Sequence, residues 1–185
     1  MGDIAARVPE LSHVVPARVL VVAGEARRAS HASVRPLCFP GTRSRVSRDG
    51  TREKPRVRVG GENILYVITL RPIWFRSSTA EQRVGTVLHE LFHCSLRFDG
   101  TLHPGRRHAT MGARFGQELR PMVRAYLERA PQSVLAPFRR RGLVRVRMWL
   151  EKPPASVAQS SRARRLYTED QLFVGLRRML SPAGD

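Results

Sequence analysis

The sequence predicts an α+β fold for this chain, in which separate strands and helices share one compact domain. The apolar runs Val19–Ala23 and Ile64–Ile68 predict strands, since both are strand-length and rich in β-branched residues. Helices are predicted after Ser78 and again after Ala109, where apolar residues recur at helical spacing. At 185 residues the chain is long enough to bury a hydrophobic core of its own.

The N-terminal part of the chain is predicted to be mainly strand. Three strands are expected, at Ala17–Ala23, Ser33–Cys38 and Asn63–Leu70. The third is the strongest of them, because its apolar residues stand together and Pro72 closes it. A basic segment, residues 27–58, lies between the first strand and the third, and its proline and glycine residues predict turns.

Two helices are predicted in the middle of the chain. The first begins at Ser78, since Ser78 and Glu81 have the spacing of a capping box, and it ends before Asp99. Its buried stripe is expected to consist of Val84, Val87, Leu88, Leu91 and Leu96. A polar loop then leads to the second helix, Ala109–Arg129, which Pro131 terminates.

The C-terminal part is predicted to contain a strand, a linker and a short helix. Leu143–Leu150 is the expected strand, because apolar residues alternate with arginines along it. Residues 153–165 are rich in Pro, Ser and Arg and are expected to be a linker. A final helix is predicted over Glu169–Leu180, since Thr168 and Gln171 can form a capping box at its start.

Positive charge is the main feature of the composition. The formal net charge is +18, nearly all of it from arginine, and the C-terminal third is strongly basic. We therefore expect a domain at residues 1–130 followed by a basic extension at residues 131–185. Such a charge favours attraction to DNA or another polyanion. Arginine together with abundant Ala, Gly and Pro is also what a GC-rich genome produces, so charge alone leaves this partner open.

The sequence His89-Glu90-Leu91-Phe92-His93 points to a specific chemistry. His89 and His93 are four residues apart, so on a helix they share one face and can bind one metal ion, for which zinc is well suited. Glu90 can take a proton from a zinc-activated water and pass it to the leaving amine of a peptide bond. The capped, apolar helix around the motif favours this interpretation over a solvated helix with two surface histidines.

A catalytic zinc ion needs a third protein ligand and keeps its fourth position for water. The residues that could supply the third ligand are His103, His108, Asp99 and Glu118. Cys94 is expected in the core instead, because adjacent helical residues point about 100° apart.

The stretch HELFHCSLRFDGTLHPGRRHATMGARF, which begins at His89, resembles the SprT-like zincins and the related phage metallopeptidase domains. In both families the HExxH motif is followed by a loop, by a histidine near a helix start, and by an aromatic residue. The resemblance implies His108 as the third ligand, with His103 as the alternative, and Phe115 as the aromatic. The sequence departs from the family pattern at Ala109, where a glycine is usual.

The resemblance implies a zincin-like fold, in which a small mixed sheet packs on the HExxH helix and a second helix. It also implies a zinc-dependent peptidase that cleaves protein or peptide substrates, with Glu90 as general base; SprT-like enzymes act on proteins bound to DNA. The resemblance covers roughly residues 17–127. Asn63–Leu70, upstream of the motif, occupies the place of the edge strand along which zincins bind an extended substrate.

A second hypothesis is a non-catalytic nucleic-acid-binding protein whose zinc site is structural or vestigial. For either hypothesis we expect a cytoplasmic protein with no membrane partner. The two cysteines, Cys38 and Cys94, cannot form a disulfide framework, and the apolar runs are too short for a transmembrane helix.

Overall fold

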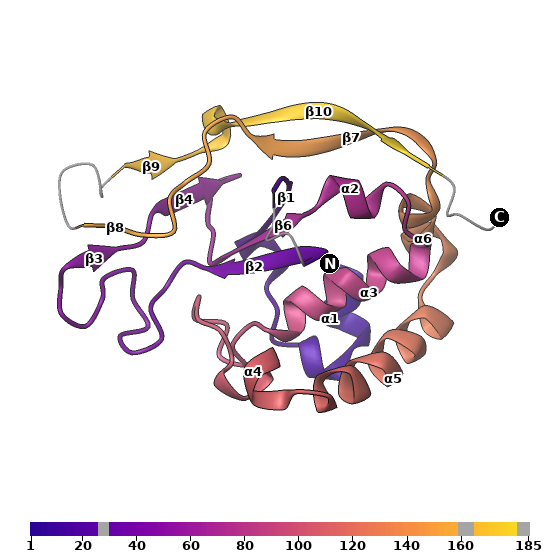
Figure 1. Cartoon of the computed structure of the whole chain (residues 1–185), viewed down its shortest axis with the longest axis horizontal. Helices are drawn as coiled ribbons and strands as arrows, with labels where there is room; N and C mark the ends of the chain where they lie inside the picture. Colours follow the sequence, from indigo (N-terminus) through magenta and orange to yellow (C-terminus); the bar gives the residue numbers. More distant parts are fainter. Residues whose placement is uncertain (26–29, 159–164, 181–185) are drawn as a thin grey trace.

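The computed structural model describes residues 1–25, 30–158 and 165–180 and shows a mixed α+β fold (Figure 1). The strands are β1 (Val19–Ala23), β2 (Ala32–Pro36), β3 (Arg52–Glu53), β4 (Arg56–Val59), β5 (Glu62–Asn63), β6 (Tyr66–Leu70), β7 (Gly142–Trp149), β8 (Val157–Ala158), β9 (Leu166–Tyr167) and β10 (Leu172–Met179). The α-helices are α1 (Gly2–Arg7), α2 (Pro72–Phe75), α3 (Ala80–Phe92), α4 (His108–Met111), α5 (Arg114–Arg129) and α6 (Gln132–Arg139). Short 3-10 turns are η1 (Pro9–Leu11), η2 (Pro16–Arg18), η3 (Pro104–Arg106) and η5 (Glu169–Gln171). The predicted α+β class is confirmed.

A five-stranded mixed sheet with the order β10-β7-β1-β6-β2 forms the centre of the molecule. β1 runs parallel to both β6 and β7, whereas β2 and β10 are antiparallel to their neighbours. The inner strands β1 and β6 carry the apolar runs that predicted them, because a strand with neighbours on both sides is buried on both faces. The two edges of the sheet are β2 and β10.

The core lies on both faces of this sheet, since successive side chains of a strand point to opposite faces. Val19, Tyr66 and Ile68 face the helices and pack with apolar residues of α1, α3 and α5. Leu20 and Val67 face the other way, into a smaller cluster with Val57, Tyr167, Ile64, Leu37 and Val22. Figure 1 shows α1, α3 and α5 together on one side of the sheet, with α3 nearest to it.

Helix α3 was predicted correctly in its type but not in its ends. Its capping box is formed by Thr79 and Gln82, one residue later than predicted, because the Ser78 hydroxyl donates to the Trp74 carbonyl of the preceding turn. The helix ends at Phe92, so Leu96 lies outside the buried stripe and is 50% exposed.

The second predicted helix is divided into α4 and α5. Gly112 separates them with φ +54°, a conformation that is unfavourable for residues with a side chain and incompatible with a continuing helix. The chain then forms α6, which the sequence did not predict, because Pro131 begins a new helix as well as ending the old one.

The predicted C-terminal helix over Glu169–Leu180 is wrong. Thr168 and Gln171 do form the capping box, but it encloses only the 3-10 turn η5. The following residues form β10, which pairs antiparallel with β7 along its whole length. Gly175 weakens a helix here, and the hydrogen-bonding groups of β7 are available to a strand, so tertiary pairing overrides the local signal.

Other predicted elements agree with the structure within one to three residues at their ends. β1 and β2 lie within the predicted ranges or one residue outside them, and β7 corresponds to the predicted Leu143–Leu150. In the predicted linker, Val157–Ala158 forms β8 against β3, while residues 159–164 lie outside the described residues. The predicted boundary at residue 130 stays a prediction, although β7 and β10 from beyond it complete the sheet.

Within the part of the chain that the structure describes, no helix combines the length and apolar character needed to span a bilayer.

Candidate metal centre

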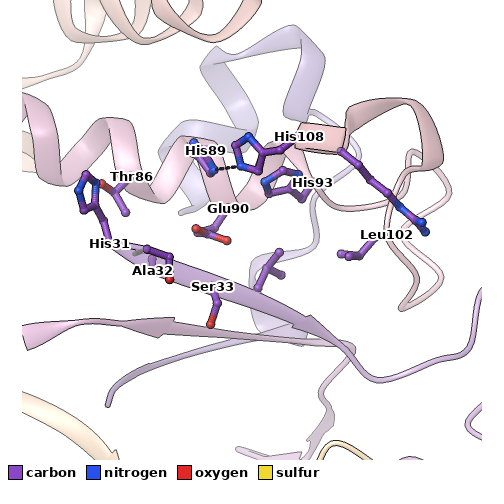
Figure 2. A pocket seen from close by; sticks show the side chains of 12 residues that line it. His31, Ala32, Ser33, Thr86, His89, Glu90, His93, Leu102 and His108 are labelled. Atoms are coloured by element: carbon purple, nitrogen blue, oxygen red, sulfur yellow. Dashed lines mark hydrogen bonds between the residues drawn. The ribbon is translucent and has the colours of Figure 1, made fainter. Parts of the chain in front are cut away.

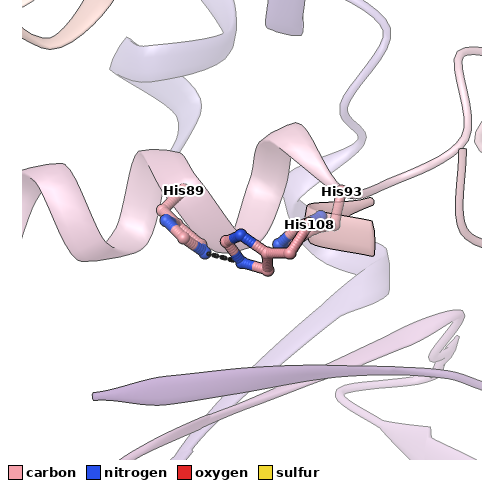
Figure 3. A group of neighbouring side chains, drawn as sticks. All are labelled: His89, His93 and His108. Carbon is pink, nitrogen blue, oxygen red and sulfur yellow. Dashed lines mark hydrogen bonds between the residues drawn. The ribbon is translucent and has the colours of Figure 1, made fainter. Parts of the chain in front are cut away.

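Three histidines converge at the end of α3, and they are the three that the sequence favoured. His89 lies in the last turn of α3, His93 is the C-cap residue directly after it, and His108 is the first residue of α4 (Figure 3). One ring nitrogen from each lies within 4.8 Å of the others, close enough to hold a metal ion. The Nε2 atoms of His89 and His108 are 3.0 Å apart.

A tight turn after α3 brings His108 back to the helix. The chain reverses directly after His93, whose carbonyl accepts from the His103 backbone N–H at 2.9 Å, and Cys94 forms a β-bridge with Leu102. Gly100, at the tip, has φ +79°, and a Cβ there would meet the Cys38 sulfur at 2.9 Å. The turn is therefore packed against the end of β2, which limits where the following helix can begin.

Buried Tyr66 fixes this turn from the sheet side. Its hydroxyl donates to the Thr101 carbonyl at 2.7 Å and accepts from the Gly100 N–H at 3.1 Å. Burial raises the pKa of Tyr66 well above its ordinary value, so the hydroxyl is protonated and can donate. The sequence alone indicated no structural role for this hydroxyl, because the contact joins residues 35 positions apart.

Hydrogen bonding orients His93. Its Nδ1 donates to the Arg106 carbonyl at 2.6 Å, which leaves Nε2 with its lone pair directed elsewhere. Metal-binding histidines in proteins commonly donate their second ring nitrogen in this way, and the bond fixes both tautomer and ring plane. The Arg106 guanidinium in turn lies over the Phe92 ring, 4.1 Å from its centroid.

Phe115 from α5 packs against all three imidazoles. Its ring centroid lies 4.7 Å from that of His89, 4.9 Å from that of His93 and 4.3 Å from that of His108. Phe115 is 4% exposed and belongs to a small apolar cluster with Phe92 and Met111. It therefore forms an apolar wall behind the histidines.

Glu90 lies between α3 and the edge strand β2, on the same side of the helix as the cluster (Figure 2). It is 5% exposed and accepts a hydrogen bond from the Val34 backbone N–H. Burial raises the pKa of Glu90 to about 7, against a smaller opposite effect of the bond from Val34. A carboxyl group with a pKa in this range can both accept and donate a proton near neutral pH.

The register of β2 explains why the Val34 backbone N–H is free to donate to the Glu90 carboxyl group. Residues at alternate positions of an antiparallel edge strand direct both backbone groups towards the partner strand or both away from it. The His31 carbonyl accepts from Arg71 and the Leu37 N–H donates to Leu65, so odd-numbered residues face β6. Even-numbered residues of β2 therefore direct their backbone groups outward, and the Val34 N–H reaches Glu90 while the Pro36 carbonyl accepts from Lys54.

This assignment corrects the predicted edge strand. Asn63–Leu70 was expected to border the site, but β6 lies inside the sheet between β1 and β2. The strand at the edge is β2. Two signals in the sequence were consistent with this arrangement, since Pro36 is tolerated at an edge and the apolar run of β6 is typical of an inner strand.

A cleft of about 680 Å³ opens over the three histidines and Glu90. Ala32, Ser33 and Val34 of β2 form one wall, and Thr86 of α3, Leu102 and Arg107 form others. His31 lies at one end, stacked on Trp74 with ring centroids 3.9 Å apart. Figure 2 shows that Glu90 points into the space between the helix and β2.

The electrostatics favour neutral imidazoles at His89 and His93. Burial, followed by the proximity of His93 and His108, lowers the pKa of His89 to about 3. Burial also lowers the pKa of His93. Neutral imidazole is the form that binds a metal ion, because the ligand atom must carry a free lone pair.

The spacing of the three nitrogens can be compared with that of three histidines bound to one tetrahedral metal ion, with zinc as the example. Three nitrogens bound at roughly 2.0–2.1 Å to one tetrahedral ion lie about 3.4 Å from one another. The Nε2 atoms of His89 and His108 are 3.0 Å apart and no two of the three ligand nitrogens are more than 4.8 Å apart, a range that includes this value. Three protein ligands with a cleft in front of them also leave room for a fourth, exchangeable ligand.

The other candidate ligands have different roles. His103 Nδ1 accepts from the Gly105 N–H and stabilises the turn η3. The Asp99 carboxylate accepts from the Thr101 N–H and hydroxyl, and Glu118 is exposed on α5. Cys94 is fully buried in the core, as predicted.

Comparisons of this chain with protein families, with curated proteins and with solved structures gave no match. Its function is therefore inferred from the residues and their geometry.

Proposed function

We propose that this protein is a zinc-dependent metallopeptidase with a zincin-like fold. The observation that carries the proposal is the combination of three converging histidines with a buried glutamate beside an edge strand. His89, His93 and His108 hold the ion, and Glu90 is the general base. A zinc ion bound here supplies a Lewis acid that polarises a carbonyl group and makes a water molecule more acidic.

The protein's own groups carry the remaining steps. An extended peptide lies along β2, where the outward-facing backbone groups of Ala32 and the Val34 carbonyl can pair with it as an additional strand. Glu90 accepts a proton from the attacking water and donates it to the nitrogen of the leaving amine. Phe115 excludes solvent from behind the imidazoles, and the Arg106 carbonyl keeps His93 in the tautomer with Nε2 free.

The open cleft favours a catalytic site over a structural zinc site. Structural zinc sites in proteins are closed by four protein ligands, whereas catalytic sites keep one position for water or substrate. Here three histidines lie at a cleft, and Glu90 lies beside them without belonging to the group that could hold the metal. A vestigial site would not need a buried glutamate next to its ligands, since burying a carboxyl group is unfavourable.

The test combines metal content with hydrolysis of a casein or quenched peptide substrate. Wild type should bind about one zinc per chain, and His108→Ala should bind far less, because two imidazoles alone hold the ion weakly. The matched control is His103→Ala, which removes a histidine from the same loop and should retain the zinc. Full zinc in His108→Ala, or its loss only in His103→Ala, would refute the ligand set. Zinc binding with no hydrolysis of any substrate by the wild type would refute the peptidase.

A further inference from the structure

The two C-terminal strands of the sheet form a ribbon that extends beyond the rest of it. β7 and β10 pair over eight residues each, from Trp149 with Leu172 to Gly142 with Met179. β1 contacts this pair in register only where Ala23 lies opposite Met148. Most of the ribbon therefore has no further strand beside it, and Figure 1 shows it as the outermost layer of the molecule.

One face of this ribbon is exposed and carries alternating arginine and aliphatic side chains. The register places each arginine opposite an aliphatic residue, since same-face partners lie directly across the strands. We define the ribbon face by six exposed residues, which form the cross-strand pairs Arg147 with Val174, Arg145 with Leu176 and Leu143 with Arg178. The aliphatic members are 55–65% exposed. A protein surface with several exposed aliphatic side chains side by side is commonly a binding site.

The charge of the ribbon is also one-sided. Residues 139–150 and 172–180 together contain seven arginines and no acidic residue. Other arginines of the fold are used internally, such as Arg83, which donates to the carbonyls of Phe75 and Phe138. No acidic residue lies directly across the strands from Arg145, Arg147 or Arg178, and the acidic residue whose pKa Arg147 helps to lower, Glu169, lies outside the ribbon. The ribbon face therefore presents positive charge and apolar surface to whatever binds it.

We propose that the ribbon face binds double-stranded DNA, with β7 and β10 lying in the major groove. That groove is about 12 Å wide and accepts a two-stranded β-ribbon. Arginine forms paired hydrogen bonds with phosphate oxygens and with guanine edges. The exposed Leu143, Val174 and Leu176 match the apolar methyl groups of thymine, which lie in the same groove.

The composition of the face selects duplex DNA over other nucleic acids. Single strands bind mainly by stacking their bases on aromatic side chains, and the ribbon face contains no aromatic residue. Phe173 projects from the opposite face of the ribbon. Trp149 lies on the same face of β7 as Arg147, but it is only partly exposed and packs against the core cluster that contains Leu20 and Val67. The major groove of A-form RNA is too narrow and deep to admit a ribbon.

This binding does not depend on the proposed metal centre. The ribbon edge β10 and the edge β2, which borders the three histidines, are the two opposite ends of the strand order. A duplex on the ribbon would therefore leave the cleft accessible.

The experiment measures fluorescence anisotropy of a labelled duplex of about 20 base pairs between about 50 and 200 mM salt. The test variant is Arg145→Ala/Arg147→Ala/Arg178→Ala in the full chain. The control is Arg114→Ala/Arg120→Ala/Arg124→Ala, which removes the same charge from exposed positions of α5. A third variant replaces the three ribbon arginines with lysine, which keeps the charge. Melting temperature and zinc content establish that each variant is folded.

We expect wild type to bind the duplex with a steep salt dependence. Three lost phosphate contacts should reduce the slope of log K against log salt by about 2–3, and the affinity at ~100 mM salt on the order of 100-fold. The α5 control should stay within about 3-fold of wild type, and the lysine variant should retain most of the binding. The proposal is overturned by equal losses in both alanine variants, by tighter binding to the single strand, or by no binding at about 50 mM salt.

Discussion

The two edges of the central sheet, β2 and β10, differ in what their unpaired sides contact. β2 has five residues, and its outward backbone groups meet other parts of the protein, with the Val34 N–H on Glu90 and the Pro36 carbonyl on Lys54. β10 has eight residues and lies with β7 at the surface, with most of its side chains exposed. One edge is therefore integrated into a cleft, and the other is part of an open surface.

Because of this difference, the two activities that we propose would use separate edges of one sheet. An unpaired edge invites pairing with another chain, so proteins cover it, shorten it or place charge on it. At β2 the cover is the α3 helix and its glutamate, which leaves backbone groups beside the three histidines. At β10 the protection is charge, since Arg177 and Arg178 lie in the strand itself. The sequence around each edge thus suits a different kind of partner.

The largest expected effects come from variants that remove one proposed activity, hydrolysis beside β2 or duplex binding at the ribbon, without the other. Glu90→Gln should lower peptide hydrolysis by about 10²- to 10⁴-fold, because the general base is lost, while zinc content and duplex affinity stay as in wild type. The triple ribbon variant should show the reverse pattern. Parallel loss of both activities in either variant would mean that the edges are coupled, and would contradict the comparison.

The structure also contains a connection between the two regions, through Arg83. This buried residue of α3 donates to the carbonyls of Phe138 and Arg140, where the chain enters the ribbon. Arg83→Met should lower the free energy of unfolding by roughly 2–4 kcal/mol, because several carbonyl groups lose a charged donor in the interior. Urea denaturation measures this.

An exposed arginine is the control for Arg83. Arg120→Met on α5 should change the free energy of unfolding by less than about 0.5 kcal/mol. A similar small effect for Arg83→Met would show that the ribbon entrance does not depend on α3.

A smaller effect is expected from the turn that places His108. Tyr66→Phe removes the hydroxyl that bonds both Thr101 and Gly100, and should lower the free energy of unfolding by about 1–3 kcal/mol. Zinc affinity should fall as well, because the turn positions the third histidine. Tyr167→Phe, a buried tyrosine of the opposite core cluster, should leave zinc affinity unchanged. Calorimetry with and without zinc distinguishes the two effects.

The smallest effect concerns pH and the end of β2. Burial lowers the pKa of Lys54 from 10.5 to about 8. Between these two pH values the unfolded chain binds more protons at this residue than the folded chain, so the free energy of unfolding rises with pH there. Lys54→Met removes this contribution, and the stability of wild type relative to the variant should therefore increase from pH 8 to 10.5.

Exposed Lys152 provides the comparison for Lys54. Lys152→Met, which replaces an exposed lysine, should keep the pH dependence of wild type. If Lys54→Met shows the same pH dependence as wild type, the lysine is not buried against the Pro36 carbonyl as the structure has it.

The histidine cluster could be predicted because its geometry is mostly local. His89 and His93 lie four residues apart on a strongly amphipathic helix, and His108 follows a loop of the expected length. His103 remained an alternative because its distance along the chain also suited a ligand. Only the turn around Gly100 and Tyr66 decides between them, and that turn depends on packing against β2 and β6.

The errors in the predicted fold share one physical origin, which is pairing between distant residues. The capping box of Thr168 and Gln171 is real, but pairing with β7 makes the next residues a strand. In the same way, the apolar run of β6 shows that the strand is buried, but not that β2 lies outside it. A local sequence pattern indicates which conformation its own residues prefer. The order of strands in a sheet depends instead on pairing with residues that are distant in the sequence.

The ribbon is held at both of its ends. Met148 lies opposite Ala23 of β1, and beyond the other end the Leu180 N–H donates to the Arg76 carbonyl at 2.6 Å while Arg141 reaches the Leu180 carbonyl. Attachment at both ends restricts the conformations of the ribbon before it binds anything. Binding therefore costs it little conformational entropy, and it can dock on a rigid surface without first folding onto it.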